Sequence, residues 1–249
     1  ALLGTFINRG GPVVSVHSFA ASTLGFLFLA FMIVLTFYSV ISIIYNYQNL
    51  TKNNIKIESY LSREASFLLN NILLVMTSLI ILWGVIFPVV SILLNGTEIS
   101  VSAPYFDKTA GPLLLLIIIL MGIGPILSWR RTTKKATFFR LLPSLIITTF
   151  MGFYLFIYGI REFFPLISFL SIIFVLTIIL REWIGGTKSR MGKSYNPLPS
   201  FLKMIVSNRG RNGGYVVHLA ILALAFGVVG TKFYDERLDL NLSIQDEVE

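Results

Sequence analysis

Six long apolar stretches are the feature that most constrains how this chain folds. A helix needs about 20 apolar residues to cross a hydrocarbon core of about 30 Å, and each stretch approaches or exceeds that length. No pattern alternating over about ten residues, as in a β-barrel strand, occurs within them, so helices are predicted to cross the bilayer. The predicted spans are residues 19–45, 66–94, 110–128, 139–160, 163–181 and 213–230.

The composition supports a membrane protein. Of the 249 residues, 55% are hydrophobic and only 13% are charged, whereas a soluble domain carries about 25% charged residues. The mean hydropathy is +0.80. The 21 Phe and 10 Tyr suit a chain packed in lipid with aromatic rings at the interfaces. These values exclude a disordered protein and, together with the helical spans, indicate an all-α polytopic membrane protein. High contents of Ile, Phe and Asn suggest an AT-rich genome, organellar, archaeal or bacterial, so the expected location is the plasma (inner) membrane or the mitochondrial inner membrane.

The distribution of charge predicts the topology. A net charge of +8 and a pI of about 9.8 would suggest a nucleic-acid partner for a soluble protein. Here most of the 20 basic residues lie in or beside three connections, residues 46–65, 129–138 and 182–212. Because cytoplasmic loops are enriched in Lys and Arg, these connections are predicted to face the cytoplasm or matrix, with both termini on the outer side. Membrane lipid is therefore the expected partner of these charges, and nucleic acid is not.

The chain divides into three regions at the sequence level. Residues 1–18 are predicted to form an outer N-terminal loop, because Gly10, Gly11 and Pro12 disfavour a helix there. Residues 19–230 form the six-helix transmembrane region.

The third region, residues 231–249, is an outer tail with a period-two pattern that predicts the start of a strand. A lone strand is unstable in water, so this segment is expected to pair with another chain or with a continuation of this one. The apolar positions of the tail pattern are Leu238, Leu240, Leu242 and Ile244.

A second outer segment, residues 95–109, is predicted to be a turn-rich loop with Tyr105 and Phe106 at interface depth.

Two inner features follow from local sequence. The long connection 185–212 contains an apolar cluster beside Lys203, which predicts a short interfacial helix. The apolar cluster beside Lys203 consists of Phe201, Leu202, Met204, Ile205 and Val206.

In the third span, Gly122 and Gly124 with Pro125 are expected to kink the helix or to allow close packing.

The residue inventory limits the chemistry. The chain has no cysteine, which excludes disulfides, thiolate metal sites, cysteine nucleophiles and covalent haem attachment to this chain. No GxxxxGK[ST] phosphate loop, nucleophile elbow or His–carboxylate metal spacing occurs. The pairs Arg161–Glu162 and Arg181–Glu182 lie at span ends, where interfacial anchoring and local ion pairs explain them. Because no acid or lysine lies mid-span, an ion-translocating subunit of a respiratory complex is disfavoured, although a structural subunit remains an alternative.

Two histidines are the candidates for imidazole chemistry. His218 lies five residues into the last span, with Gly213 and Gly214 about one turn before it. It is either a packed histidine bonded to a neighbour or a ligand to haem iron, since a neutral imidazole binds iron and tolerates burial. His17 precedes the first span and is either a helix-start histidine or an imidazole presented to haem at the outer surface.

Five segments together carry a family resemblance, in matching order and spacing over nearly the whole chain. They are LLGTFINRGGPVVSVHSFA (2–20), SREASFLLNNILLV (62–75), ISVSAPYFDKTAGPL (99–113), LMGIGPILSWRR (120–131) and NRGRNGGYVVHLAILALAFGVVGT (208–231). The combination resembles the CcmF-type cytochrome c haem lyases. In that family the first segment carries an outward-facing haem-ligand histidine, and the last carries a transmembrane one.

The resemblance implies a membrane subunit that accepts haem from a CcmE-type chaperone and supports its thioether attachment to the CxxCH motif of apocytochrome c. His17 matches an outward axial ligand of the transferred haem, the position at which catalysis occurs. His218 matches an axial ligand of a resident b-type haem, the expected reductant. Arg9 is a candidate contact for a haem propionate. CcmH- or CcmI-type thiol proteins are further implied partners.

The chain also departs from the family. The tryptophan-rich WWD motif is missing, and Trp83, Trp129 and Trp183 are scattered. In the family that motif and the two partner histidines lie upstream of the first matching segment. The chain is therefore expected to be a central or C-terminal part, from a split gene or a longer protein. It would be active only with a partner chain or N-terminal half that carries the WWD motif. A catalytically silent scaffold that keeps the fold is the remaining alternative.

Overall fold

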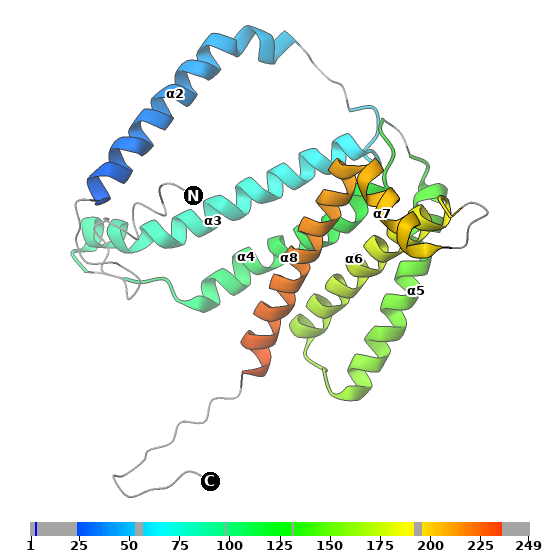
Figure 1. Cartoon of the computed structure of the whole chain (residues 1–249). Helices are drawn as coiled ribbons and strands as arrows, with labels where there is room; N and C mark the ends of the chain where they lie inside the picture. The colour runs from blue at the N-terminus through cyan, green and yellow to red at the C-terminus, as the bar shows by residue number, and fades with distance from the viewer. Residues whose placement is uncertain are drawn as a thin grey trace, which may run out of the picture. The chain divides into compact units, whose positions relative to one another are not determined.

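A computed structural model describes residue 3 and residues 24–52, 57–97, 99–130, 132–191 and 196–235 (Figure 1). Every regular element within these ranges is helical, which confirms the all-α prediction. The N-terminal loop with Arg9 and His17, and the tail pattern from Leu238 onward, lie outside the described residues. The elements are α2 (Leu24–Lys52), α3 (Arg63–Asn95), α4 (Ala103–Ile123), the 3-10 turn η1 (Gly124–Ile126), α5 (Lys134–Tyr158), α6 (Phe163–Lys188), α7 (Pro197–Ser207) and α8 (Arg209–Tyr234).

Six of these helices are long and apolar enough to cross a membrane, which confirms the predicted number of spans among the described residues. They are α2, α3, α4 with η1, α5, α6 and α8. Each is at least 24 residues long, longer than the minimum of about 20, so the ends reach beyond the hydrocarbon or the helices tilt. The chain is an integral membrane protein.

The predicted start of the third span is wrong, whereas its predicted end at residue 128 lies within two residues of the observed end at Ile126. Helix α4 begins at Ala103 rather than at residue 110, because Asp107 and Lys108 limit burial in lipid but do not stop a helix. The predicted outer loop 95–109 therefore shortens to the residues between Asn95 and Ala103. At the other end, the α-helix finishes at Ile123, and a 3-10 turn that contains Pro125 follows.

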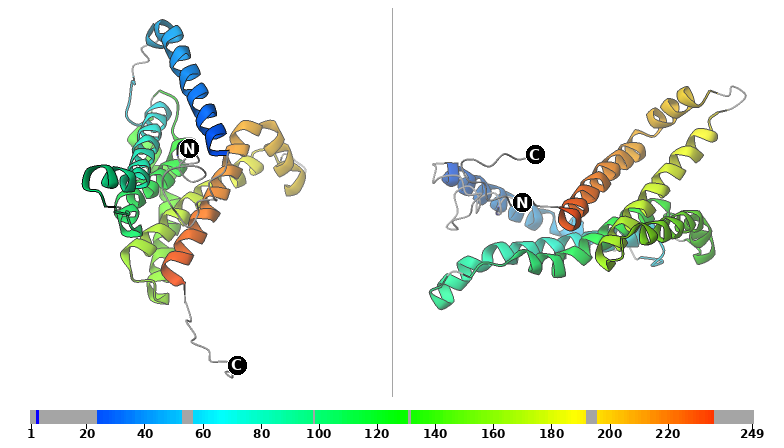
Figure 2. Two further views of the ribbon diagram at one scale, coloured as in Figure 1. Left: turned by 90° about the vertical axis from the view of Figure 1, so that its left-hand side faces the viewer. Right: turned by 90° about the horizontal axis from the view of Figure 1, so that it is seen from below.

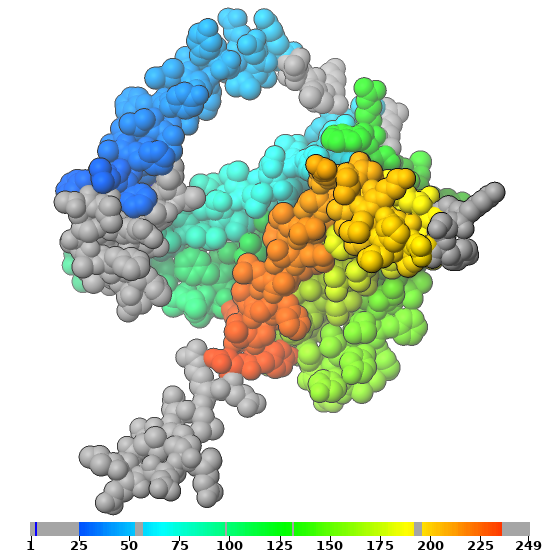
Figure 3. Space-filling model, in the orientation of Figure 1, coloured from blue at the N-terminus to red at the C-terminus, as the bar shows by residue number. Residues whose placement is uncertain are grey.

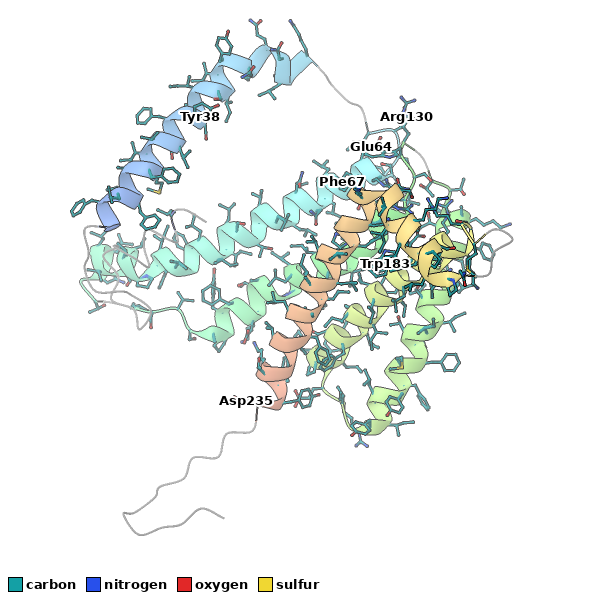
Figure 4. The ribbon with its side chains drawn as sticks, in the orientation of Figure 1. Tyr38, Glu64, Phe67, Arg130, Trp183 and Asp235 are labelled. Carbon is teal, nitrogen blue, oxygen red and sulfur yellow. The ribbon has the colours of Figure 1, made fainter. Side chains whose placement is uncertain are left out.

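The contacts between Cα atoms divide the chain into two units. The first contains residues 1–117 and 129–131, and the second contains residues 118–128 and 132–249. In the first unit, α2 buries none of its apolar window, and Tyr38, midway along it, is 70% exposed (Figure 4). Among the described residues, helix α2 therefore shares no buried core with another helix.

Helix α3 buries one face lined mainly by small residues, which allows close approach of its neighbours. Gly84 lies on this face, and a Cβ atom there would come within 2.5 Å of the Phe106 ring from α4. The Tyr105 hydroxyl donates to the carbonyl of Ile80 at 3.4 Å. Tyr105 and Phe106 thus pack α4 against α3 instead of lying in a loop. The buried residues of α3 are Ser66, Leu73, Thr77, Gly84, Pro88 and Ser91.

The start of α3 holds the segment that follows η1. The Glu64 carboxylate accepts a hydrogen bond from the backbone N–H of Arg130 at 2.9 Å, and Arg130 has a left-handed φ of 64°. The Trp129 ring lies edge-on to the Phe67 ring, with centroids 6.1 Å apart. The Cζ atom of the Arg63 guanidinium lies 5.3 Å from the centroid of the Trp129 ring. Figure 4 shows Glu64, Phe67 and Arg130 gathered at this end of the helix.

Helix α6 is the centre of the second unit and packs against α5, α7 and α8 (Figures 1 and 2). Val175, Ile178 and Ile179 are at most 1% exposed and form its core with Tyr215 and Leu222 of α8. Because the other sides of α6 and α8 are also apolar, van der Waals packing rather than a hydrophobic-to-polar contrast selects this interface.

Helix α7 confirms the short helix predicted in the connection between the last two spans. It lies where α6 ends and α8 begins (Figure 2). Met204 is 1% exposed, and Phe201 contacts Trp183 edge-on at 5.7 Å between centroids. Leu198 and Leu202 remain exposed on another side of the helix, as expected for a helix in the interface.

Arginines join the ends of three elements in the second unit. Arg181 donates to the carbonyl of Arg140 at 2.8 Å and to the Ser144 hydroxyl at 3.4 Å, rather than to Glu182. Arg140 in turn donates to the carbonyl of Ile126 at 3.1 Å. The basic end of α6 is therefore bonded to α5, and α5 to η1, instead of forming the predicted local ion pair.

Candidate functional site

His218 lies on α8, nine residues after its first residue, Arg209, and so about 13 Å along the helix axis. The imidazole is partly buried, and its ring is edge-on to Tyr215, with centroids 6.4 Å apart. Tyr215 is 2% exposed and belongs to the α6–α8 core. The core thus fixes one side of the histidine, while another side reaches the surface of the helix.

The Nδ1 atom of His218 is buried and has no hydrogen-bond partner among the described residues. The predicted packed histidine, bonded to a neighbour, is therefore not what this part of the chain shows. Burial of an unpaired polar atom costs about 1–3 kcal/mol. An ordered water molecule or a bound group would both account for an unpaired atom of this kind.

The surface of α8 beside His218 offers room for such a partner. Gly214 precedes the histidine by about one turn on the same side of the helix, and a Cβ atom added there would meet nothing within 4 Å. About one turn after the histidine, Ile221 is 41% exposed. The space-filling view shows α8 uncovered along one side (Figure 3). A flat macrocycle or another helix fits against this surface.

These residues fit a haem with one axial ligand supplied from this chain. A neutral imidazole keeps one nitrogen free for iron and can be buried without charge. The apolar surface around His218 suits a porphyrin ring. No group of three or more His, Cys, Asp or Glu side chains suited to a metal ion occurs in the described ranges. A six-coordinate iron here would thus need a second imidazole from elsewhere.

The other predicted site residues, His17 and Arg9, lie outside the described residues, so His218 is the member of the predicted set that the structure places. Asn212 is a residue that sequence reasoning missed. It is 1% exposed, and its Nδ2 donates to the carbonyls of Met204 at 3.0 Å and Ile205 at 3.4 Å. Its signal was a single amide at the start of an apolar span, too common to single out.

Comparisons with curated proteins find relatives that are named as cytochrome c-type biogenesis proteins. The chain is 27% identical over 250 residues to the cytochrome c-type biogenesis protein CcmF of Haemophilus influenzae, covering 100% of this chain and 37% of that protein. It is 36% identical over 132 residues to the cytochrome c-type biogenesis protein CycK of Rhizobium meliloti, covering 53% of this chain and 19% of that protein. It is 32% identical over 154 residues to CcmF of Escherichia coli, covering 61% of this chain and 22% of that protein.

No protein-family model matches the chain, and no solved structure matches it significantly. The chain spans about a third of the length of the full-coverage curated relatives it matches. Along its whole length it is similar to a part of the CcmF-type cytochrome c biogenesis proteins, which confirms the resemblance predicted from its sequence.

Proposed function

We propose that the chain is a membrane subunit of a cytochrome c haem lyase, in which His218 is an axial ligand of a resident b-type haem. The observation that carries the proposal is a partly buried imidazole, that of His218, on a membrane-spanning helix, with no hydrogen-bond partner for its Nδ1 among the described residues. It is supported by relatives whose names assign them to cytochrome c biogenesis. An ionisable side chain inside a membrane span is costly and usually marks a functional site.

The role of His218 in this proposal is to hold and orient. Contact with Tyr215 fixes the imidazole against the core, so the ring does not have to be ordered when iron binds. A bis-imidazole b-type haem supplies one-electron transfer, because no open iron position remains for oxygen. The second imidazole, in this proposal, comes from the partner chain or N-terminal half that also carries the WWD motif.

His17 has a different role in the proposal. It binds the iron of the haem that is the substrate, delivered by a CcmE-type chaperone, while the two thiols of an apocytochrome c CxxCH motif form thioether bonds. Arg9 is the proposed contact for a propionate of that haem. Moderate binding by His17 suits a substrate that must leave, since tight ground-state binding slows release. CcmH- or CcmI-type proteins are the proposed source of reduced thiols.

The first experiment is a pyridine haemochrome spectrum of the complex purified in mild detergent, for the unchanged chain and for His218→Ala. We expect b-type haem near stoichiometry in the unchanged complex and a large loss in the variant, with assembly intact. Val216→Ala, an exposed position two residues away and hence on the opposite side of α8, is the matched control and should keep its haem. Equal haem in His218→Ala and the unchanged complex would refute the ligand role and return His218 to a packed histidine.

His17→Ala tests the second role separately. We expect it to abolish holo-cytochrome c formation while the resident haem remains, because His17 acts on the substrate haem alone. Holo-cytochrome c is measured by haem staining of the product in cells that depend on the variant. Normal maturation in these cells would remove His17 from the mechanism. Absence of haem from the intact, unchanged complex would instead favour a structural subunit or silent scaffold.

A further inference from the structure

Helix α8 presents one continuous face on which His218 lies. An α-helix has 3.6 residues per turn, so residues three, four and seven positions apart share a side. The face changes character along the helix, from a charged end through a glycine and the histidine to an apolar end. Its residues are Arg211, Gly214, His218, Ile221, Ala225 and Val229.

Arg211 is the only charged residue among those six. It lies seven residues, or close to two full turns, before His218 and so about 10 Å along the axis. Its side chain is exposed and makes no hydrogen bond or ion pair with the described residues. Nothing within the α6–α8 core therefore accounts for its direction.

The helix dipole does not favour an arginine at the N-terminal end of α8, where Arg211 lies. The first turn of α8 carries no acidic residue, and the positive end of a helix dipole disfavours a cation by a few tenths of a kcal/mol. A basic residue at this end follows from the predicted topology. The positive-inside rule explains a positive charge at this end of the span, but it does not explain why the charge lies on the face that carries His218.

We infer that Arg211 is the propionate-binding residue of the haem that His218 ligates. The inference rests on the function proposed above. A b-type haem is itself amphipathic, with two carboxylates at one edge and an apolar ring beyond them. On this face Arg211 would hold the carboxylates, and Gly214, beside which space is open, would admit the ring. Ile221 and the residues after it would supply the apolar contacts.

Guanidinium suits this role because its planar fork can bond a carboxylate through two parallel N–H groups. The length of the arginine side chain and the radius of the porphyrin together span the two turns between Arg211 and His218. Lys232, the basic residue at the far end of α8, lies 14 residues from His218, about 21 Å along the axis. It is too distant to replace Arg211.

Arg209 provides a matched control. It has the same charge, the same helix end and a similarly exposed side chain, but it lies two and a half turns from His218 and hence on the opposite side of α8. The experiment compares Arg211→Gln, Arg209→Gln and Arg211→Lys in the intact complex. Its readouts are bound b-type haem, the rate of haem transfer to excess apomyoglobin, and the midpoint potential of the bound haem.

We expect Arg211→Gln to lose haem roughly fivefold faster, as for a partly exposed ion pair, and to lower the midpoint potential. The potential falls because a cation near the propionates favours the added electron. Arg209→Gln should match the unchanged complex in both readouts. Arg211→Lys should keep most of the potential, because it keeps the charge, and it remains informative if Arg211→Gln fails to assemble.

The inference is overturned if Arg211→Gln and Arg209→Gln behave alike, whether both lose haem or neither does. It is also overturned if Arg211→Lys, which keeps the charge, lowers the midpoint potential as far as Arg211→Gln does. These outcomes leave the ligand role of His218 intact. Retention of haem by His218→Ala is the separate result that removes the proposed site, and Arg211's role with it.

Discussion

The close approach between the end of α4 and α6 predicts a large effect from one methyl group. A Cβ atom at Gly122 would lie 2.9 Å from Cγ2 of Val175 and 3.3 Å from Cδ1 of Ile178. Both partners are at most 1% exposed, so neither can rotate into free space. Ordinary contact needs at least 3.4 Å, and the variant Gly122→Ala must therefore push α6 or Val175 by about half an ångström.

Overpacking of this kind costs about 1–3 kcal/mol. Alanine also gains up to about 1 kcal/mol of helix propensity over glycine, which hides part of the cost. Gly227→Ala in α8 is the control, because a Cβ atom there would meet nothing within 4 Å. The propensity gain is shared by both variants, so the difference between them reports the steric clash alone and should be about 1–3 kcal/mol.

The assay is thermal unfolding in one detergent, followed by light scattering or intrinsic fluorescence. The difference corresponds to a midpoint about 2–12 °C lower for Gly122→Ala than for Gly227→Ala. Adding Val175→Ala to Gly122→Ala removes the clashing methyl groups and should cost less than Val175→Ala does alone in the unchanged background. Equal midpoints for the two glycine variants, or strictly additive effects of the pair, would refute the packing argument.

Three further predictions concern helix ends and one buried amide. Ser62→Ala should destabilise the protein by about 1 kcal/mol, because the Ser62 hydroxyl caps α3 by accepting from the Ala65 N–H at 3.1 Å. Asn212→Leu should speed amide hydrogen exchange in α7, because the Asn212 amide bonds to the carbonyl of Met204. Gly159→Val should cost about 1–2 kcal/mol, because Gly159 ends α5 at a φ of 117°.

Conservative variants serve as the controls for these three. Ser62→Thr keeps a capping hydroxyl and should unfold close to the unchanged protein. Gly159→Asn is strained at a φ of 117° too, but Asn tolerates a positive φ better than a β-branched residue does, so it should cost less than Gly159→Val. For Asn212→Leu, exchange in α5 should stay constant while exchange in α7 rises. Uniform change across both helices would show a global loss of stability and contradict a local role for the amide.

The number of spans could be predicted from the sequence because lipid thickness sets one length scale and the apolar stretches match it. Their ends could not. Asp107 and Lys108 end the apolar stretch of the third span, yet the helix continues through them to Ala103. Burial in lipid and helix formation are separate properties, and hydropathy reports only the first. The 3-10 turn at Pro125 shows the reverse case, where backbone chemistry ends an α-helix inside an apolar run.

The packing within the second unit could not be predicted from the sequence either. Val175 and Leu180 are both apolar residues of α6, yet one is 0% and the other 43% exposed. In water a polar face would mark the outside, whereas in lipid both sides are apolar and only shape decides. The candidate site could be proposed from the sequence, because a histidine inside an apolar span is costly and therefore conspicuous. The role inferred for Arg211 could not, because the positive-inside rule already accounts for a basic residue at that end of the span.

The arginine bonds between η1, α5 and α6 have a consequence for the response to bilayer thickness. Arg181 holds the carbonyl of Arg140, and Arg140 holds the carbonyl of Ile126, so the three ends share one depth. A thinner bilayer, which makes a single helix tilt to hide its surplus apolar length, would have to tilt α5 and α6 together. Because α6 also carries the core against α8, lipid thickness would be transmitted to the helix that bears His218.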